Sequence, residues 1–185
     1  MSSIKLTIAD LEALPDDGNR YELIEGEVHV AKQPHWLHQR ICLRIGVVLD
    51  TWSRQTGHGA VNLAPGVIFA EDSGVAPDVV WISSQRMAVV DLTSGRVTGA
   101  PDLVVEVLSP GVENETRDRR VKLQLYSRHG VKEYWVVDWR QRTLEVYRRV
   151  EGALALLHTL HPEDTLTSPL LPGFSCPVAD LLGDD

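Results

Sequence analysis

Three short apolar runs restrict the folds open to this chain more than any other feature of the sequence. They read "PDVVWIS" (77–83), "PDLVVEVL" (101–108) and "KEYWVVDW" (132–139). Strands that are apolar on both faces are typical of a sheet that is covered on both sides. A helical pattern, "ENETRDRRVKLQLYSRHG" (113–130), separates the second run from the third. This strand–helix–strand order predicts two parallel strands joined by a crossover.

The sequence also predicts further elements around such a sheet. A long helical pattern begins after Pro34 and ends at Gly57. Its apolar residues recur at three- and four-residue spacing and form one stripe: Leu37, Ile41, Ile45, Val48 and Trp52. "YELIEGEVHVA" (21–31) alternates around a central glycine and predicts a hairpin. We therefore predict a single α/β domain over residues 1–185, with a mixed central β-sheet flanked by α-helices.

Composition narrows the class of protein. The chain has 185 residues, of which 43% are hydrophobic, enough for one compact core. No stretch approaches about 18 consecutive apolar residues, so we expect no membrane span. The N-terminal sequence lacks the apolar core of a secretion signal, and Cys42 and Cys176 lack the spacing of a zinc site. We therefore expect a protein of the reducing cytoplasm.

The net charge of -8 argues against binding to nucleic acid through bulk electrostatics, because phosphate contacts require Lys and Arg. It leaves room for a locally basic groove, or for an acidic site that recruits a divalent cation. Basic residues cluster between Arg117 and Lys132. This cluster is either a phosphate-facing helix surface or an ordinary solvated helix face.

One carboxylate, Glu106, interrupts the apolar run of residues 103–108. Because side chains alternate along a strand, Glu106 shares a face with Val104 and Leu108. An ionised carboxylate in apolar surroundings is costly unless a cation, a metal ion or a proton neutralises it. Glu106 is therefore a candidate functional residue. The alternatives are an exposed strand end and a pair with a structural arginine.

Two aspartates, each within an "APD" sequence, are candidate partners of Glu106. Asp102 precedes Glu106 by four residues on the same strand, so their α-carbons lie about 13 Å apart at about 3.3 Å per residue. Mg²⁺ holds its ligands at about 2.0–2.1 Å, which this pair cannot easily achieve. Asp78 comes from another strand, and it converges with Glu106 on one ion if the two strands are adjacent, about 4.8 Å apart. The geometry therefore favours Asp78.

A set of sequence blocks extends in order over nearly the whole chain. The blocks are "LEALPDDGNRYELIEGEV", "HQRICLRIGVVL", "APDVVWIS", "GAPDLVVEVLSP", "KLQLYSRHGVKEYWVVD" and "SPLLPGFS". A "PD" dipeptide alone is weak, but the ordered set resembles the Uma family of bacterial endonucleases. That family belongs to the PD-(D/E)XK, or restriction-endonuclease-like, superfamily. The resemblance implies the fold of that superfamily for this chain.

The resemblance implies that Asp78 and Glu106 are catalytic residues that bind Mg²⁺ or Mn²⁺. The superfamily lysine normally follows the acidic residue by two positions, where this chain has Leu108. The resemblance points instead to Lys122, on the following helix, as the third catalytic residue. Lys122 precedes Tyr126 by four residues and would lie at the edge of the inward helix face. The ordinary alternative is a surface lysine.

Further residues are accessory candidates. The resemblance implies that Glu22 and Glu27, on either side of the hairpin turn, line the site, and of the two we favour Glu27. It also makes His38 a substrate-contacting or ion-adjacent residue, although a lone helix histidine is ordinarily a packing residue. The basic residues of the crossover helix would contact the phosphates of the substrate: Arg117, Arg119 and Arg120.

The function implied by the resemblance is metal-dependent hydrolysis of phosphodiester bonds in nucleic acid, with DNA as the expected substrate. By analogy with such folds we expect a homodimer, and the segment "RTLEVYRR" (142–149) is an exposed candidate for its interface. The alternative is a nuclease-fold protein that binds nucleic acid or acts as a scaffold without turnover, which Leu108 and the negative charge favour. The two hypotheses differ on whether Lys122 points into the acidic pocket. A small-molecule hydrolase ranks last, because the sequence has no nucleophile elbow or phosphate-binding glycine loop.

Overall fold

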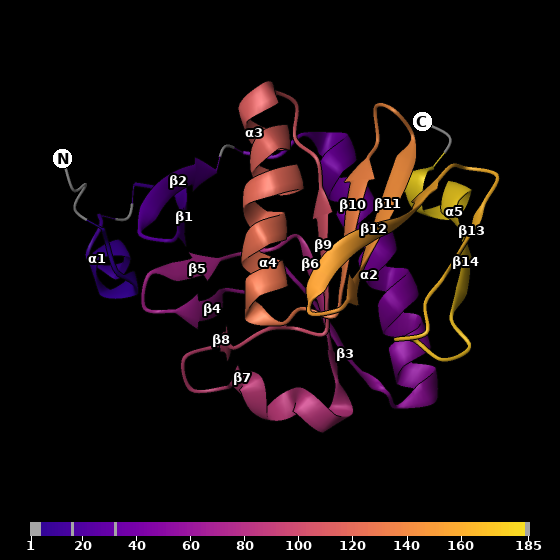
Figure 1. Ribbon diagram of the computed structural model, residues 1–185, viewed down its shortest axis with the longest axis horizontal. Coiled ribbons are helices and arrows are strands. Elements are labelled where there is room, and N and C mark those ends of the chain that lie inside the picture. The colour runs from indigo at the N-terminus through magenta and orange to yellow at the C-terminus, as the bar shows by residue number, and fades with distance from the viewer. Residues whose placement is uncertain (1–4, 16, 32, 184–185) are drawn as a thin grey trace.

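A six-stranded mixed sheet forms the centre of the molecule (Figure 1). The computed structural model describes residues 5–15, 17–31 and 33–183. The strands follow one another in the order β12 (Ala153–Leu160), β11 (Thr143–Val150), β10 (Glu133–Asp138), β9 (Leu103–Val107), β6 (Val79–Ser83) and β3 (Gly59–Leu63). The pair β9–β10 is parallel, and the other neighbouring pairs are antiparallel. The predicted mixed sheet, with its parallel central pair, is therefore confirmed.

The connection between β9 and β10 is one long helical segment. It consists of α3 (Val112–Thr116), the π-helical η2 (Arg117–Lys122) and α4 (Leu123–His129). Gly130 ends it with φ 90°, a left-handed conformation that favours glycine. The helix is where the sequence predicts it, but its wider π-helical turn is not visible in the apolar spacing. Such turns are frequent at functional sites.

Helices cover both faces of the central sheet (Figure 1). Because successive side chains of a strand point to opposite faces, alternate residues pack into two different cores. One face of β9 packs toward α2 (Trp36–Thr56) through Leu103, Val105 and Val107. The other face, with Val104 and Leu108, packs against α4. Glu106 belongs to this second face by its position in the strand. The predicted alternation along residues 103–108 therefore holds.

A second six-stranded sheet lies beside the first, and the sequence did not predict it. Its order is β2 (Glu27–Ala31), β1 (Arg20–Ile24), β5 (Ser73–Val75), β4 (Val67–Ala70), β8 (Arg96–Thr98) and β7 (Val90–Asp91). The hairpin β1–β2 and the strand β4 match predicted elements. The other three strands have only two or three residues each, too few for a periodic pattern to appear. This second sheet brings β1 to the end of the central sheet.

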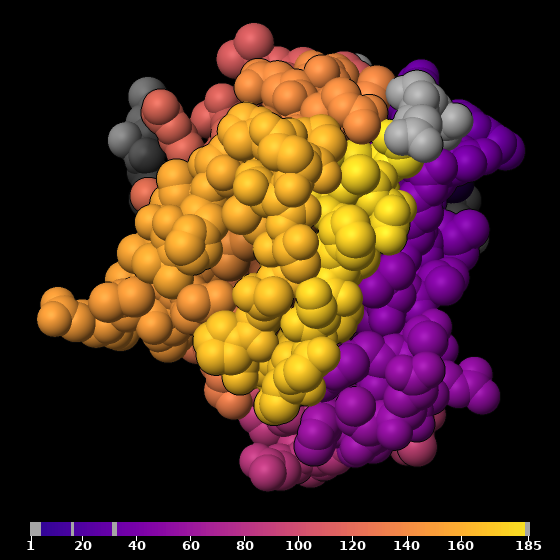
Figure 2. Space-filling view, turned by 90° about the vertical axis from the view of Figure 1, so that its right-hand side faces the viewer, coloured from indigo at the N-terminus to yellow at the C-terminus, as the bar shows by residue number. Residues whose placement is uncertain are grey.

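The C-terminal segment packs along α2, as Figures 1 and 2 show. Here β13 (Thr165–Thr167) and β14 (Ser175–Pro177) form a small sheet that leads into α5 (Val178–Leu182). Arg44 of α2 donates a hydrogen bond to the carbonyl of Leu182 at 3.0 Å. The remaining helices are α1 (Ile8–Glu12) and the 3₁₀ helix η1 (Ser84–Val89). None of the helices described has the length and apolar character needed to cross a membrane.

Strand β11 contains most of the segment 142–149, the expected interface, but it is not exposed as an edge. It pairs with β10 on one side and with β12 on the other. Its backbone groups are therefore satisfied within the sheet, and it offers no free edge to another chain. The expectation that "RTLEVYRR" is exposed is wrong, because β12 extends the sheet beyond it and none of its residues is exposed. Its part in a dimer interface stays a prediction.

The contact between α2 and the central sheet should contribute strongly to stability. Leu49 lies on α2 and is 1% exposed, within the core cluster that faces β9. We expect Leu49→Ala to lower the free energy of unfolding by about 2–5 kcal/mol, because it removes buried methyl groups and leaves a cavity. Leu92→Ala is the matched control, since Leu92 is 90% exposed, and should cost at most about 0.5 kcal/mol. Urea denaturation followed by circular dichroism measures both values, and equal losses would contradict this packing.

Candidate active site

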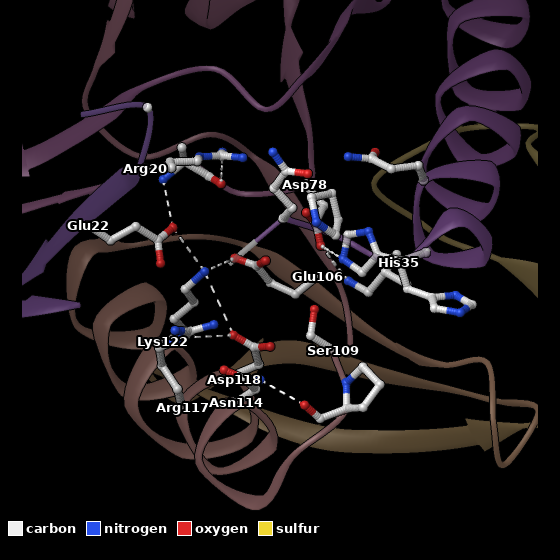
Figure 3. A pocket seen from close by; sticks show the side chains of 18 residues that line it. Arg20, Glu22, His35, Asp78, Glu106, Ser109, Asn114, Arg117, Asp118 and Lys122 are labelled. Atoms are coloured by element: carbon white, nitrogen blue, oxygen red, sulfur yellow. Dashed lines mark hydrogen bonds and ion pairs between the residues drawn. The ribbon is translucent and has the colours of Figure 1, made fainter. Parts of the chain in front are cut away.

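A pocket of about 400 Å³ lies where the two sheets, the π-helical turn and the start of α2 meet (Figure 3). Its acidic side chains come from elements far apart in the sequence: Glu22 from β1, Asp78 from the residue before β6, Glu106 from β9 and Asp118 from η2. Its basic side chains are those of Arg20, Arg117 and Lys122. His35 and His38 also line it. The pocket therefore concentrates ionisable groups.

Lys122 is the centre of this arrangement, and Figure 3 shows its ammonium group among three carboxylates. Its Nζ lies 2.9 Å from Glu106 Oε1, 3.1 Å from Glu22 Oε1 and 3.7 Å from Asp118 Oδ1. The lysine is only 3% exposed. Because an ammonium group has three protons to donate, it can satisfy several acceptors at once. Lys122 thus points into the acidic pocket and away from bulk solvent.

Local structure explains why these groups converge. Because side chains alternate along β9, Glu106 points toward the crossover helix. There Tyr126 Oη donates a hydrogen bond to Glu106 Oε1 at 2.6 Å. Asp118 and Lys122 lie four residues apart on one face of that helix. Glu22 arrives from the second sheet and accepts a hydrogen bond from the backbone N–H of Ala76 at 3.0 Å. The site therefore requires both sheets.

Asp78 lies next to Glu106 through the pairing of β6 with β9. Val79 pairs with Val105 in antiparallel register, so the preceding residue of β6 falls opposite Glu106. Asp78 Oδ2 accepts a hydrogen bond from the backbone N–H of Val107 at 2.8 Å. The geometric preference for Asp78 over Asp102 agrees with this arrangement.

Asp102 has a structural environment at the other end of β9. Its carboxylate is fully buried and accepts hydrogen bonds from the backbone N–H of Ser83 at 2.8 Å and from Arg86 at 3.1 Å. Lys132 adds an ion pair at 2.7 Å. Asp102 therefore fixes the start of the strand and takes no part in the pocket.

A buried hydrogen-bonded chain holds Asp78 from the side of α2. His38 Nε2 lies 3.2 Å from Asp78 Oδ2, and His38 Nδ1 lies 3.5 Å from Cys42 Sγ. Burial raises the pKa of the Cys42 thiol far above its ordinary value, so the thiol stays protonated near neutral pH. One ligand atom from each of the three residues lies within 4.8 Å of the others. Because the imidazole ring contacts the other two through opposite nitrogen atoms, the arrangement fixes the orientation of Asp78.

The pKa values of the central pair reflect burial and mutual charge. Burial raises the pKa of Glu106 to about 8; the ammonium of Lys122 opposes this rise, whereas the nearby carboxylates reinforce it. Burial alone would lower the pKa of Lys122, but the carboxylates of Glu106 and Glu22 outweigh it and raise that pKa. The lysine therefore remains charged, and it is surrounded by more carboxyl groups than it can neutralise. A further cation, or a proton on Glu106, balances such a site.

The other acids respond to their own neighbours. Burial is the largest single effect on Asp78 and raises its pKa, but the hydrogen bond and charge of His38, the backbone N–H of Val107 and the charge of Lys122 together lower that pKa. Burial is likewise the largest effect on Glu22, and the charge and hydrogen bond of Lys122, the backbone N–H of Ala76 and the charge of Arg117 together lower its pKa. The pKa of Asp118 is raised, mainly by burial. Asp78 and Glu22 are therefore the two carboxylates of the pocket that most favour the ionised form.

The structure reverses the expected order of the two hairpin glutamates. Glu22 is 2% exposed and binds Lys122, whereas Glu27 is exposed and does not line the pocket. Register explains the difference: Glu22 pairs with His29, and Glu27 pairs with Ile24 next to the turn. Glu27 thus lies two residues, or about 7 Å, further along the hairpin.

The three arginines predicted to contact phosphate lie in different environments. Arg117 lines the pocket, with Nε 3.6 Å from Asp118 Oδ1. Arg119 pairs with Glu145 of β11 and lies 3.4 Å from Asp138 Oδ2, so it faces the sheet. Arg120 is exposed outside the pocket. Of the three, only Arg117 lines the pocket, and phosphate contacts by Arg119 and Arg120 stay predictions that the pocket does not support. Arg119 points elsewhere because neighbouring helix residues differ in direction, and Arg120, three residues from Arg117, does so in a π-helical turn that is wider than an α-helical one.

Asp118, Tyr126 and Arg20 are among the residues of the site that the sequence analysis missed. The first two could have been found from Lys122, since they lie four residues before and four residues after it and so share its helix face. Asp118 Oδ1 and Arg117 Nε are buried polar atoms that have no hydrogen-bond partner among the described residues. Buried polar groups normally have a partner. These atoms, together with the excess of carboxylates, fit a pocket that receives a hydrated cation or an anionic substrate group.

Carboxylate oxygens are the ligands that Mg²⁺ and Mn²⁺ prefer in proteins. Asp78 and Glu106 supply them from adjacent strands at one wall of the pocket. The residues present therefore fit a divalent metal ion of this type.

A mixed sheet between helices, with an acidic pocket and a buried lysine at its end, defines the nuclease class of restriction-endonuclease-like folds. Comparisons with known proteins agree. The chain matches the Uma2 family model, described as "Putative restriction endonuclease", over residues 8–179, and it belongs to that family. A solved structure from Anabaena variabilis, described as "a putative nuclease belonging to DUF820", has the same fold. Its TM-score is 0.76 at 20% sequence identity, over 96% of this chain and 97% of that one. No curated relative matches the sequence.

Removal of the buried ammonium group should destabilise the folded chain. We expect Lys122→Met to lower the free energy of unfolding by about 3–5 kcal/mol at pH 8, because it leaves buried carboxylates without their cation. In this variant the folded carboxylates bind protons more tightly than the unfolded ones, so its stability should recover as the pH falls toward 5.

Lys132→Met is the matched control for this measurement. The Lys132 side chain is half-exposed, and its partner Asp102 keeps Arg86 and the backbone N–H of Ser83. We expect a loss of about 1 kcal/mol or less. Urea denaturation at pH 5 and pH 8 gives both values. A Lys122→Met variant as stable as the wild type at pH 8 would contradict the role of the ammonium group.

Proposed function

We propose that this protein is a divalent-metal-dependent endonuclease that hydrolyses phosphodiester bonds of DNA. The single observation that carries the proposal is the position of Lys122, whose ammonium lies 2.9 Å from Glu106 in the pocket that Asp78 also lines. The PD-(D/E)XK motif combines a lysine with two carboxylates. In this chain the lysine lies on the crossover helix instead of on the strand. Membership of the Uma2 family supports the same reaction class.

In this proposal Asp78 and Glu106 hold Mg²⁺ or Mn²⁺. When bound, the ion supplies Lewis-acid chemistry: it neutralises phosphate charge and lowers the pKa of a water molecule. Lys122 provides a fixed positive charge for the oxygen atoms on which negative charge grows in the transition state. Glu22 and Tyr126 hold Lys122 and Glu106 in place through their hydrogen bonds. These groups are positioned before substrate binds, which reduces the reorganisation that the reaction requires.

Substrate binding is assigned to the basic rim of the pocket. Arg117 has a guanidinium group at the wall of the pocket, and Arg20, also at the wall, is held by a hydrogen bond to the carbonyl of Ala76. Arginine recognises phosphate oxygens through paired hydrogen bonds. A small local group of cations can act in this way although the whole chain has a net charge of -8.

The catalytic assignment is tested with conservative substitutions that keep side-chain size. We expect Asp78→Asn, Glu106→Gln and Lys122→Met to reduce cleavage of supercoiled plasmid in Mg²⁺ or Mn²⁺ by at least about 10²-fold, since each removes a charge that the transition state requires. Because Lys122→Met is also expected to be destabilised, circular dichroism must show that each variant is folded under the assay conditions. Manganese binding, measured by isothermal titration calorimetry on these folded preparations, should weaken in the two acid variants and persist in the lysine variant.

The controls separate this proposal from its alternatives. Arg120→Ala, outside the pocket, should keep wild-type cleavage. Equal nicking by all preparations would identify a contaminating nuclease and overturn the assignment. Binding of DNA without cleavage in the wild type, under conditions where Mn²⁺ binds, would instead support a nuclease-fold binding protein. Linear duplex DNA, single-stranded DNA and RNA of the same sequence, compared at equal concentration, test the assignment to DNA.

The role of Arg117 is tested by its comparison with Arg120, three residues away on the same helix. We expect Arg117→Ala to weaken binding of a labelled DNA duplex and to reduce the slope of log K against log salt by about one, because one phosphate contact is lost. Arg120→Ala should change the affinity and the slope much less. Fluorescence anisotropy at several salt concentrations measures both. An equal effect of the two substitutions would contradict the placement of substrate at the pocket wall.

A further inference from the structure

Two aromatic rings are stacked at the edge of the pocket. The centroids of the His35 and Trp139 rings lie 5.1 Å apart, and the two ring planes are within 12° of parallel. His35 lines the pocket (Figure 3) and is exposed, whereas Trp139 is partly buried against the core that faces α2. Aromatic rings attract one another at this separation. The pair therefore offers the pocket an aromatic surface that is supported from below by the core.

Both rings are held in place before any ligand binds. His35 is the N-cap of α2, and its Nδ1 accepts a hydrogen bond from the backbone N–H of Leu37 at 3.2 Å. Trp139 Nε1 donates a hydrogen bond to the carbonyl of Leu108 at 3.1 Å. Because neither ring has to be ordered when a ligand arrives, a ligand that stacks on them loses less affinity to conformational entropy.

Strand pairing places this stack at the edge of the central sheet where the catalytic candidates lie. Val137 of β10 pairs in parallel with Val107 of β9, so Trp139 follows the end of β10 at the edge where β9 also ends. Val107 donates its backbone N–H to Asp78 at this same edge. His35 and Asp78 line one pocket. A nucleic acid whose phosphate is bound in the pocket therefore has the aromatic surface within reach of a neighbouring base.

We propose that His35, supported by Trp139, stacks on an unpaired base of the nucleic acid next to the phosphate bound in the pocket. The inference rests on the proposed function, because it names the feature of the substrate that the nuclease site recognises. Stacking of this kind tolerates any sequence, since every base has a π face. A base inside a duplex has both faces covered by its neighbours, so it stacks on His35 only after it leaves the helix. The preferred substrate is therefore a single strand, or a duplex with an unpaired nucleotide.

His35 also caps α2, and two substitutions separate the cap from the stack. His35→Asn keeps a side-chain acceptor that caps helices well, but it removes the ring. His35→Phe keeps an aromatic ring and removes the acceptor. Stacking requires that the Phe variant bind nucleic acid better than the Asn variant, whereas a purely structural role as a cap requires the reverse order.

Binding of a short single-stranded oligodeoxynucleotide, measured by fluorescence anisotropy, tests the proposal. Ca²⁺ replaces Mg²⁺ in the buffer, and electrophoresis verifies that the oligonucleotide stays intact. We expect His35→Asn to weaken binding by about fivefold to 150-fold and His35→Phe to bind nearly as well as the wild type. Binding of a fully paired duplex should change much less in both variants. Circular dichroism verifies that each variant is folded.

Trp36→Ala is the matched control, because Trp36 is 73% exposed and adjacent to His35 in sequence but does not line the pocket. It should bind the oligonucleotide as the wild type does. A larger loss in Trp36→Ala than in His35→Asn would overturn the proposal, because the base would then stack outside the pocket. A Phe variant that binds more weakly than the Asn variant would also overturn it, in favour of the cap alone.

An abasic nucleotide, moved along the oligonucleotide one position at a time, identifies the base that His35 contacts. In the wild type, one position should weaken binding about as much as His35→Asn does. The two changes together should weaken it no further, because both remove the same contact. Additive losses at every position, or a wild-type chain that does not bind the oligonucleotide, would overturn the proposal.

The same preparations distinguish the stacking proposal from the nuclease assignment. Non-additive losses at one position, with no cleavage by the wild type in Mg²⁺ or Mn²⁺, would support stacking and contradict the nuclease. Cleavage by the wild type, with a His35→Asn variant that binds and cleaves the single strand as the wild type does, would contradict stacking and leave the nuclease assignment intact.

Discussion

The buried ammonium group of Lys122 is the interaction on which the rest of this site depends. Without it, carboxylates from β1, β9 and the crossover helix would meet in a space from which water is largely excluded. Like charges at such distances cannot all remain ionised in a medium of low dielectric constant. The lysine joins the two sheets and the crossover helix electrostatically. It therefore links the integrity of the fold to the chemistry of the pocket.

The same interaction explains how a glutamate is tolerated in an otherwise apolar strand. On one face of β9, Leu103, Val105 and Val107 contribute to the core beneath α2. On the other face Glu106 receives hydrogen bonds from Lys122 and Tyr126, so its carboxylate is not left without partners. Leu108, two residues further on, is fully buried in the second core cluster. A lysine at that position would have to displace apolar packing, and the crossover helix supplies the cation from above the strand.

The sequence is informative about regular elements and much less so about where they meet. The alternation of side chains along residues 103–108 was sufficient to place Glu106 on the sheet face that the crossover helix covers. The distance between adjacent strands, compared with the distance along one strand, was sufficient to prefer Asp78 over Asp102. The second sheet could not be predicted, because three of its strands have two or three residues and no readable period. The preference for Glu27 over Glu22 followed from the missing second sheet. The pairing of β1 with β5 in that sheet brings Glu22 to the pocket.

The grouping of the helix arginines had a different physical origin. Arg119 was grouped with Arg117 by proximity in sequence, but an α-helix turns each residue by about 100° relative to the one before it. Arg120 is three residues from Arg117, a spacing that unites side chains on an α-helix, but both lie in the wider π-helical turn and only Arg117 lines the pocket. Four-residue spacing, applied to Lys122, identifies Asp118 and Tyr126 as residues on the same helix face. Neither composition nor the sequence motif had predicted a role for them.

Helix α2 shows how this periodicity lets one element serve two surfaces. Its inner residues, such as Ile45 and Leu49, pack on the central sheet, and His38 at its start reaches Asp78. Its outer residues, such as Trp36, Leu43 and Val47, are exposed. Because the helix is fixed to the sheet by a large apolar contact, His38 has a fixed position beside Asp78.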